Sequence, residues 1–331
     1  MKKTPIIIAV ALLLAAVAIG AYTTLTSATQ NTTPVRLDLP IGAKSATMDS
    51  IVDANHLVKT HTLFNMIVHV RGLDKAIKPG SYLIQPHTRL TTLVQKLYHG
   101  NQDLVRITIG KHRVPATLNE YLCRMLAHDD FQFTVADLDH IRPNTYEVYW
   151  TVGPEQLRQR LIQEEDHFWN SIPKGGNGLS RRELLERITP HLTATEVTIL
   201  ASIVEEETNA TEEKGTIASV YLNRLCKGMP LQADPTVKYA VGDFSLRRIL
   251  NTHLATDSPF NTYIHTGLPP HAICTPSAQS IDAVLLAPIT NYLYFCAKED
   301  FSGRHNFACT LAEHNRNAER FHQAMNRRGI R

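Results

Sequence analysis

Residues Thr193 to Thr208 read TATEVTILASIVEEET and form the most informative segment of the chain. Thr193 and Glu196 fit a capping box, in which a hydroxyl accepts from an unpaired N–H of the first turn and a carboxylate reaches back. Apolar residues then recur at helical spacing, with two isoleucines widening the band: Val197, Ile199, Leu200, Ala201, Ile203 and Val204. The pattern predicts a helix that is buried on nearly every side.

Three consecutive glutamates end this predicted helix. At about 100° per residue, Glu206 falls opposite the centre of the apolar stripe, and Glu205 and Glu207 fall on its two flanks. A carboxylate on an apolar flank is poorly hydrated, so its pKa should rise, and a glutamate that stays protonated near neutral pH can act as a general acid. Spacing does not choose between Glu205 and Glu207, and a solvated helix end is the alternative reading.

Composition limits the classes of function. The chain has 331 residues, so we expect two or three domains. Its net charge is +3 with no block of Lys or Arg, so we expect no nucleic-acid partner. Its five cysteines form no CxxC pair and its histidines are not clustered at ligand spacing, so we expect no metal site and no cofactor. Motifs for phosphate-binding loops, zinc proteases and serine hydrolases are absent from the sequence.

The N-terminus predicts export. Lys2 and Lys3 precede an apolar run from Pro5 to Ala21, which is at the short end for crossing ~30 Å of hydrocarbon. Basic residues stay on the cytoplasmic side, so we expect residues 1–22 to be a single-pass anchor in the inner membrane and the body to be periplasmic. A cleaved signal peptide is the alternative. Residues 23–37 are rich in Thr, Ser, Asn and Gln and predict a flexible polar linker.

The body of the chain mixes helical and strand patterns, which predicts an α+β fold. Residues 38–112 form a small subdomain with helices near 46–57 and 90–97 and strands near 81–84 and 105–109. Residues 113–331 form a larger domain. Within it we expect a second helix after the central one, capped by Asn209 and Glu212, and loops over 229–239 and 258–276.

Seven motifs occur in the order typical of one family. They are LASIVEEET (200–208), IASVYLNRL (217–225), GMPLQADPTVKY (228–239), SPFNTY (258–263), GLPP (267–270), NYLYF (291–295) and HNF (305–307). Together they resemble the MltG/YceG-like endolytic murein transglycosylases, and residues 38–112 resemble the LysM-like subdomain at the front of that family. Lys111-His112-Arg113 departs from the family, which often has Glu-Gly there, and so does Ala308-Cys309, where Thr or Asn is common.

The resemblance implies a function and a site. It implies cleavage of the MurNAc-β-1,4-GlcNAc bond inside peptidoglycan glycan strands, leaving 1,6-anhydro-MurNAc ends and terminating strand elongation. The sugar's own 6-hydroxyl attacks, so one carboxylate can serve as acid and then base, and the family motif assigns this role to Glu205. The expected substrate-binding residues are Glu207, Gln232, Asp234, Tyr239, Asn261, Tyr263 and Asn306. For Gln232, Asp234, Asn261 and Tyr263 the alternative role is turn structure.

The resemblance also implies partners. These are the peptidoglycan glycan strand, the membrane through the N-terminal helix, and peptidoglycan synthases; the LysM-like subdomain implies glycan contact, with a small packing domain as its alternative. A non-catalytic glycan-binding scaffold of the cell-wall synthesis machinery is the alternative function. A hydrolase is a third, and its product would be one water heavier than an anhydro end.

Overall fold

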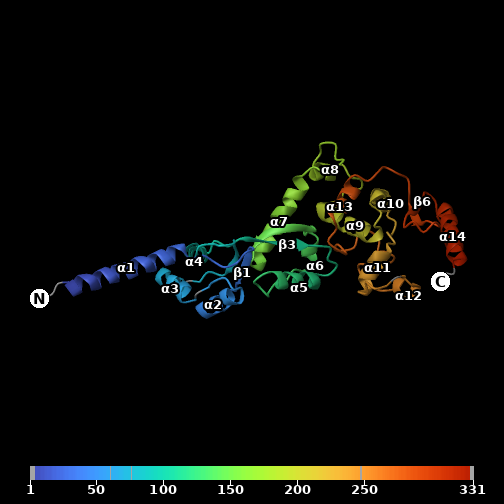
Figure 1. Ribbon diagram of the computed structural model, residues 1–331. Coiled ribbons are helices and arrows are strands. Elements are labelled where there is room, and N and C mark those ends of the chain that lie inside the picture. Colours follow the sequence, from blue (N-terminus) through green and yellow to red (C-terminus); the bar gives the residue numbers. More distant parts are fainter. Residues whose placement is uncertain (1–3, 60, 76, 247, 329–331) are drawn as a thin grey trace. The chain divides into compact units, whose positions relative to one another are not determined.

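The computed structural model describes residues 4–59, 61–75, 77–246 and 248–328, so the predicted topogenic residues Lys2 and Lys3 lie outside the described residues (Figure 1). The chain divides into two compact units. Unit 1 comprises Met1–Ile107, Cys123–Asp130 and Tyr146–Gly153, and unit 2 comprises Thr108–Leu122, Phe131–Thr145 and Pro154–Arg331. The sequence predicts one boundary between residues 112 and 113, whereas the chain passes from one unit to the other after Ile107, Leu122, Asp130, Thr145 and Gly153.

Unit 1 is built on an antiparallel pair of strands covered by helices. In chain order its elements are α1 (Thr4–Thr26), β1 (Val35–Leu39), α2 (Ser45–Ala54), α3 (His61–Arg71), η1 (Leu73–Lys75), β2 (Gly80–Ile84) and α4 (Leu90–His99). β1 pairs with β2 so that Leu37 lies opposite Tyr82. Both side chains are fully buried, as are those of Phe64 and Leu97 on the helices. Alternate residues of a strand face the same side, so one face of the strand pair lies in the core. The predicted strand and helix near 81–97 are confirmed.

The N-terminal segment consists of an apolar helix and a following connection whose backbone is hydrogen-bonded to the rest of unit 1. Apolar side chains of α1 from Ile8 to Tyr22 are exposed. Within the described ranges, no helix combines the length and the hydropathy that crossing a membrane requires. After α1, where a flexible linker is predicted, Thr29 N–H donates to Thr88 O at 2.8 Å and Gln30 N–H donates to Leu57 O at 2.9 Å. The membrane anchor at residues 1–22 stays a prediction.

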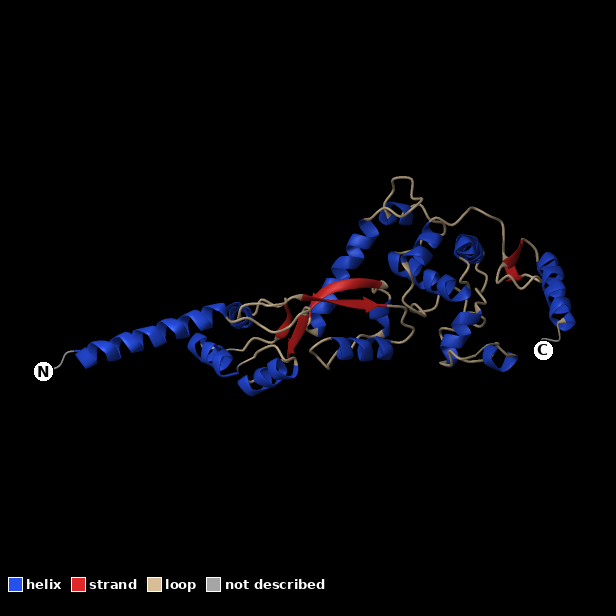
Figure 2. Cartoon of the chain, viewed as in Figure 1, coloured by secondary structure: helices blue, strands red, loops and turns tan. Residues whose placement is uncertain are grey.

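Three elements contribute residues to both units: β3 (Leu104–Ile109), α5 (Pro115–Met125) and β4 (Asn144–Tyr149). β3 pairs with β4 in a two-stranded sheet. The other elements belong to unit 2: α6 (Val135–Leu138), α7 (Pro154–Asn170), α8 (Arg181–Leu185), α9 (Ala194–Glu207), η2 (Thr211–Glu213), α10 (Lys214–Cys226), α11 (Asp234–Val241), α12 (Asn251–Leu254), α13 (Ala278–Leu285), β5 (Tyr294–Ala297), β6 (His305–Ala308) and α14 (Leu311–Arg327). Helices outweigh the short two-stranded sheets (Figure 2), which confirms a mixed α+β fold.

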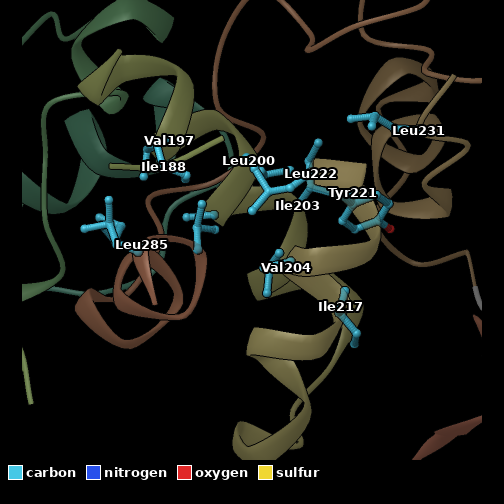
Figure 3. Close-up of a cluster of buried hydrophobic side chains, with 14 of the residues drawn as sticks. Ile188, Val197, Leu200, Ile203, Val204, Ile217, Tyr221, Leu222, Leu231 and Leu285 are labelled. Carbon is cyan, nitrogen blue, oxygen red and sulfur yellow. The ribbon is translucent and has the colours of Figure 1, made fainter. Parts of the chain in front are cut away.

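The central helix α9 has the predicted cap and core. The Thr193 hydroxyl accepts from Glu196 N–H at 3.2 Å, and the Glu196 carboxylate accepts from Thr193 N–H at 2.7 Å. All eight residues from 197 to 204 are buried. Leu200, Ile203 and Val204 gather with side chains of α10 (Figure 3), and burying each large apolar side chain contributes about 1.5–3 kcal/mol. The end of α9 is therefore fixed in a packed core.

Two local predictions in unit 2 are wrong. Residues 229–239 are predicted as a loop, but α11 begins within them, because Asp234 followed by Pro235 suits the first turn of a helix as well as a turn. Asn209 does not cap the second helix. The short helix η2 intervenes, and α10 begins after Glu213, whose side chain makes no capping hydrogen bond.

Candidate active site

Glu205 lies at the end of α9 in a network of donors. Its Oε2 accepts from Ser277 Oγ at 2.6 Å, from Lys214 Nζ at 3.0 Å and from Ser280 Oγ. Burial alone would raise its pKa, but the two serine hydrogen bonds and the lysine outweigh burial and lower the pKa to about 2. The expectation of a raised pKa at Glu205 is therefore wrong. At neutral pH this group is a carboxylate with no proton to donate.

Glu206 is held between two cations. Lys111 Nζ lies 2.9 Å from its Oε1 and Arg113 Nη2 lies 2.7 Å from its Oε2. Burial favours the protonated form, but these two partners prevail and lower the pKa. The helical period places this residue away from the stripe, and the tripeptide Lys111-His112-Arg113 supplies the charges that cover it. Glu206 is thus an ionised, structural carboxylate.

Glu207 behaves in the opposite way. Burial raises its pKa to about 7, and the negative charge of Asp234 adds to the rise, while a hydrogen bond from Tyr221 and the charge of Lys238 only partly oppose it. The Tyr221 hydroxyl donates to Glu207 Oε2 at 3.2 Å. A carboxyl group with this pKa is partly protonated at neutral pH, which is the state that a general acid needs.

Glu207 also borders open space. It lines a pocket of about 280 Å³ together with Arg224, Leu231, Gln232, Asp234, Tyr263, Phe295, Cys296, Ala297 and His305. A second pocket of about 360 Å³ shares Glu207 and Asp234 with the first and adds Glu206, Pro235, Lys238, Arg248 and Ile249. Two of the three terminal glutamates are thus tied to fixed partners, and the third opens onto both pockets.

Three of the predicted substrate-binding residues meet Glu207 at the first pocket. The Tyr263 hydroxyl donates to Asp234 Oδ1 at 2.7 Å, and burial together with this bond raises the pKa of Tyr263. Gln232 has a positive φ of 51°, and its N–H donates to Thr262 O at 3.1 Å. Gln232 lies just before α11, and Asp234 is the first residue of this helix. The helix that the sequence does not predict is therefore the element that positions both residues.

The other predicted substrate-binding residues lie elsewhere. Asn261 is fully buried, and its amide donates to the carbonyls of Leu254 and Thr256 at 2.9 Å each, so it serves the turn. Tyr239 packs on Phe260 with ring centroids 4.6 Å apart and lines neither of the two pockets that Glu207 borders. Asn306 is also absent from both linings, and its amide donates to Glu299 at 2.8 Å.

Sequence reasoning missed three residues of the site. Tyr221, Arg224 and His305 all stand inside the quoted motifs, but their polar groups could not be assigned from spacing. Arg224 is buried, and its guanidinium donates to Leu231 O at 2.8 Å and to Leu293 O at 2.6 Å, which fixes the backbone on two sides of the pocket. Tyr221 reads as a core residue in the sequence, and its hydroxyl reaches Glu207. Over the described ranges no group of three or more His, Cys, Asp or Glu side chains is placed to hold a metal ion.

Comparison with known proteins identifies the family. The sequence model of the YceG-like family matches residues 37–320. The chain belongs to the YceG-like family. This YceG-like chain is 29% identical over 325 residues to the endolytic murein transglycosylase of Bacillus subtilis, with 89% of this chain and 86% of the relative covered.

Two further proteins are similar to this chain. The endolytic murein transglycosylase of Streptococcus pneumoniae strain D39 is 34% identical over 141 residues, which is 41% of this YceG-like chain and 25% of the relative. The crystal structure of a putative YceG-like protein from Listeria monocytogenes superposes with a TM-score of 0.51 at 24% identity, covering 86% of this chain and 99% of that one. The likeness to the crystal structure supports the fold, and the resemblance predicted from the motifs is confirmed.

Proposed function

We propose that this YceG-like protein is an endolytic murein transglycosylase, which cleaves peptidoglycan glycan strands at internal bonds. The observation that carries the proposal is the Glu207 carboxyl group: its pKa is raised to about 7 and it borders two pockets. The names of the Bacillus and Streptococcus relatives support the same activity. A partly protonated carboxyl group at the pocket supports catalysis over the alternative of a scaffold that only binds glycan, since binding alone does not need a general acid.

Within this function we assign the acid to Glu207 and not to Glu205. A general acid must hold a proton near neutral pH and border a space that a substrate can enter. Glu207 meets both conditions, whereas the carboxylate of Glu205 is ionised and tied to Ser277 and Lys214. The role of Glu205 is to join α9 to α10 and α13, and so to hold the end of α9 in place.

The reaction that fits one acid is an intramolecular displacement. Glu207 protonates the oxygen between MurNAc and GlcNAc while the 6-hydroxyl of MurNAc attacks C1, which leaves a 1,6-anhydro end and requires neither water nor an enzyme nucleophile. Positive charge develops at C1, and the carboxylate of Asp234 is the anion of the pocket that can stabilise it. The hydrogen bond from Tyr263 holds Asp234 in that position.

The deciding experiment compares two isosteric variants of the purified protein. Glu207→Gln should reduce cleavage of isolated glycan strands by about 10²–10⁴-fold. Glu205→Gln should retain cleavage at a temperature where circular dichroism shows it folded. Mass spectrometry of the products reads the chemistry, because an anhydro end is one water lighter than a hydrolytic end. Retained cleavage in Glu207→Gln, with loss in folded Glu205→Gln, would return the role to Glu205, and a wild-type protein that binds strands without cutting them would favour the scaffold.

The cellular setting follows from the substrate. Peptidoglycan lies outside the cytoplasmic membrane, so we place the body of the chain in the periplasm, where cleavage of nascent strands would end their elongation alongside peptidoglycan synthases. We also propose that unit 1 contacts glycan. Its order β1, α2, α3, β2 belongs to the region that resembles a LysM-like subdomain. Measuring how glycan strands bind to variants with substitutions on the exposed surface of unit 1 tests this contact separately from cleavage.

A further inference from the structure

A buried carboxylate–histidine pair stands at the pocket of Glu207. His305 begins β6, and its Nδ1 lies 2.9 Å from Glu213 Oε2. The backbone N–H of His305 also donates to both oxygens of Glu213, at 3.1 and 3.2 Å. The two side chains are only 13% and 11% exposed. Glu213 therefore fixes both the backbone and the ring of His305.

This contact determines which ring nitrogen is free. A carboxylate accepts hydrogen bonds, so Nδ1 carries the hydrogen and Nε2 of the neutral ring keeps its lone pair. Phe295 meets the ring edge to face, with centroids 5.3 Å apart and an interplanar angle of 87°. The imidazole is therefore held on two sides, and it contributes to the lining of the pocket that Glu207 borders.

The other ionisable groups of this pocket are committed to other tasks or, like the Cys296 thiol, whose pKa burial raises, stay protonated. Glu207 must begin the reaction protonated, so in a single concerted displacement it cannot also accept the 6-hydroxyl proton. Asp234 accepts from the Tyr263 hydroxyl, and Arg224 carries a positive charge that binds backbone carbonyls. The attacking 6-hydroxyl must still lose a proton as it forms its new bond.

We propose that His305 Nε2 is the base that accepts the proton of the attacking 6-hydroxyl, and that Glu213 is the positioning residue that aims it. The inference rests on the proposed transglycosylase function. As the bond from O6 to C1 forms, the O6 proton moves to Nε2. The bond from C1 to the glycosidic oxygen breaks, and that oxygen takes the proton of Glu207. Imidazolium and carboxylate remain, and transfer of one proton through solvent from His305 to Glu207 restores the starting state.

Chemical rescue tests this assignment. His305→Ala should lower kcat about 100-fold while KM stays within about threefold, and added imidazole should restore much of the lost rate. Pyrazole has nearly the same shape but is a far weaker base, so it should restore little. His322→Ala, on the exposed face of α14, is the matched control and should leave kcat unchanged. Equal rescue by pyrazole and imidazole would reveal a packing role and overturn the proposal.

The positioning role of Glu213 has its own variant. Glu213→Gln keeps the shape but removes the charge that selects the ring tautomer, so kcat should fall by at least about tenfold. Imidazole should not restore this variant, because its own ring still fills the site. If alanine at position 305 lowers the melting temperature, His305→Asn, which can still hydrogen-bond Glu213, replaces it.

The outcomes separate the two proposals. If Glu207→Gln abolishes cleavage while His305→Ala keeps more than about a third of kcat, the base assignment fails and the transglycosylase function stands. A higher KM at unchanged kcat in His305→Ala also overturns the base assignment. If the wild-type protein cleaves no strand, the function itself fails.

Discussion

Neighbouring side chains give each of the three glutamates at the end of α9 a different protonation state. Glu205 is ionised by serines and a lysine, Glu206 by Lys111 and Arg113, and Glu207 is held near its midpoint at neutral pH. Helical periodicity does not separate them by exposure, because the Glu206 side chain is 13% exposed and the Glu205 side chain 17%. It cannot choose the acid, because deciding partners such as Ser277 and Arg113 lie 72 and 93 positions away in the sequence.

At the residue scale, cleavage should fall on the alkaline side as Glu207 loses its proton. The pKa of about 7 predicts a decline of kcat above neutral pH. Asp234→Asn removes a negative charge that raises this pKa, so the decline should begin at lower pH. Initial rates measured from about pH 5 to about pH 9 give the pH at which kcat begins to decline. Asp129→Asn, an exposed change in unit 1, is the control, and an unmoved limb in Asp234→Asn would contradict the assigned coupling.

The raised pKa of Glu207 also predicts how stability changes with pH. The folded-state pKa lies above that of the unfolded chain, so its stabilising contribution is complete below about pH 4.5 and is lost as pH rises through about 7. Glu207→Gln removes this loss. Its melting temperature should match the wild type in acid and exceed it at about pH 8. A difference that does not grow with pH would show that the carboxyl group is well hydrated.

Glu205 predicts the reverse. Its lowered pKa stabilises the fold above about pH 4.5, and that contribution is lost as pH falls toward 2. Glu205→Gln leaves Lys214, whose side chain is 6% exposed, without its counter-charge. We expect a loss of about 2–4 kcal/mol in the free energy of unfolding at pH 7. Adding Lys214→Met should recover part of the loss in urea titrations, and a double variant no better than the single one would contradict this origin.

At the element scale, local signals predict helices well and their connections poorly. The capping box and the buried face of α9 depend on neighbours in sequence, and the structure confirms them. α11 is missed because Asp-Pro suits two local structures. The pairing of β5 with β6 is not predicted, because strand pairing is not a local property of the sequence.

The cap of α9 gives a prediction for this scale. Thr193→Ala removes the side chain that accepts from Glu196 N–H, and it should lower the free energy of unfolding by about 1 kcal/mol. Thr195→Ala, two residues later and inside the helix, is the control and should not lower stability, because alanine has the higher helix propensity. Urea denaturation measures both, and equal stabilities would show that the cap contributes nothing.

At the scale of the whole molecule, the sequence predicts the class of fold and the family but not how the units share the chain. Composition shifts favour one boundary after the small subdomain. The compact units instead exchange at five points, and residues such as Leu126 and Val148 are buried within unit 1 although they follow the predicted boundary. Long-range packing, which leaves no local mark in the sequence, produces this division.

The interleaving has a consequence for biosynthesis. The chain emerges from the ribosome in one direction, and unit 1 receives its final piece, Tyr146–Gly153, before any of Pro154–Arg331 has appeared. Unit 1 can therefore mature while the segment that carries the acid is still being made. The stretches Thr108–Leu122 and Phe131–Thr145 are made before the rest of unit 2. The charges of Lys111 and Arg113, in the first of these stretches, therefore lack the Glu206 carboxylate until that residue has been made.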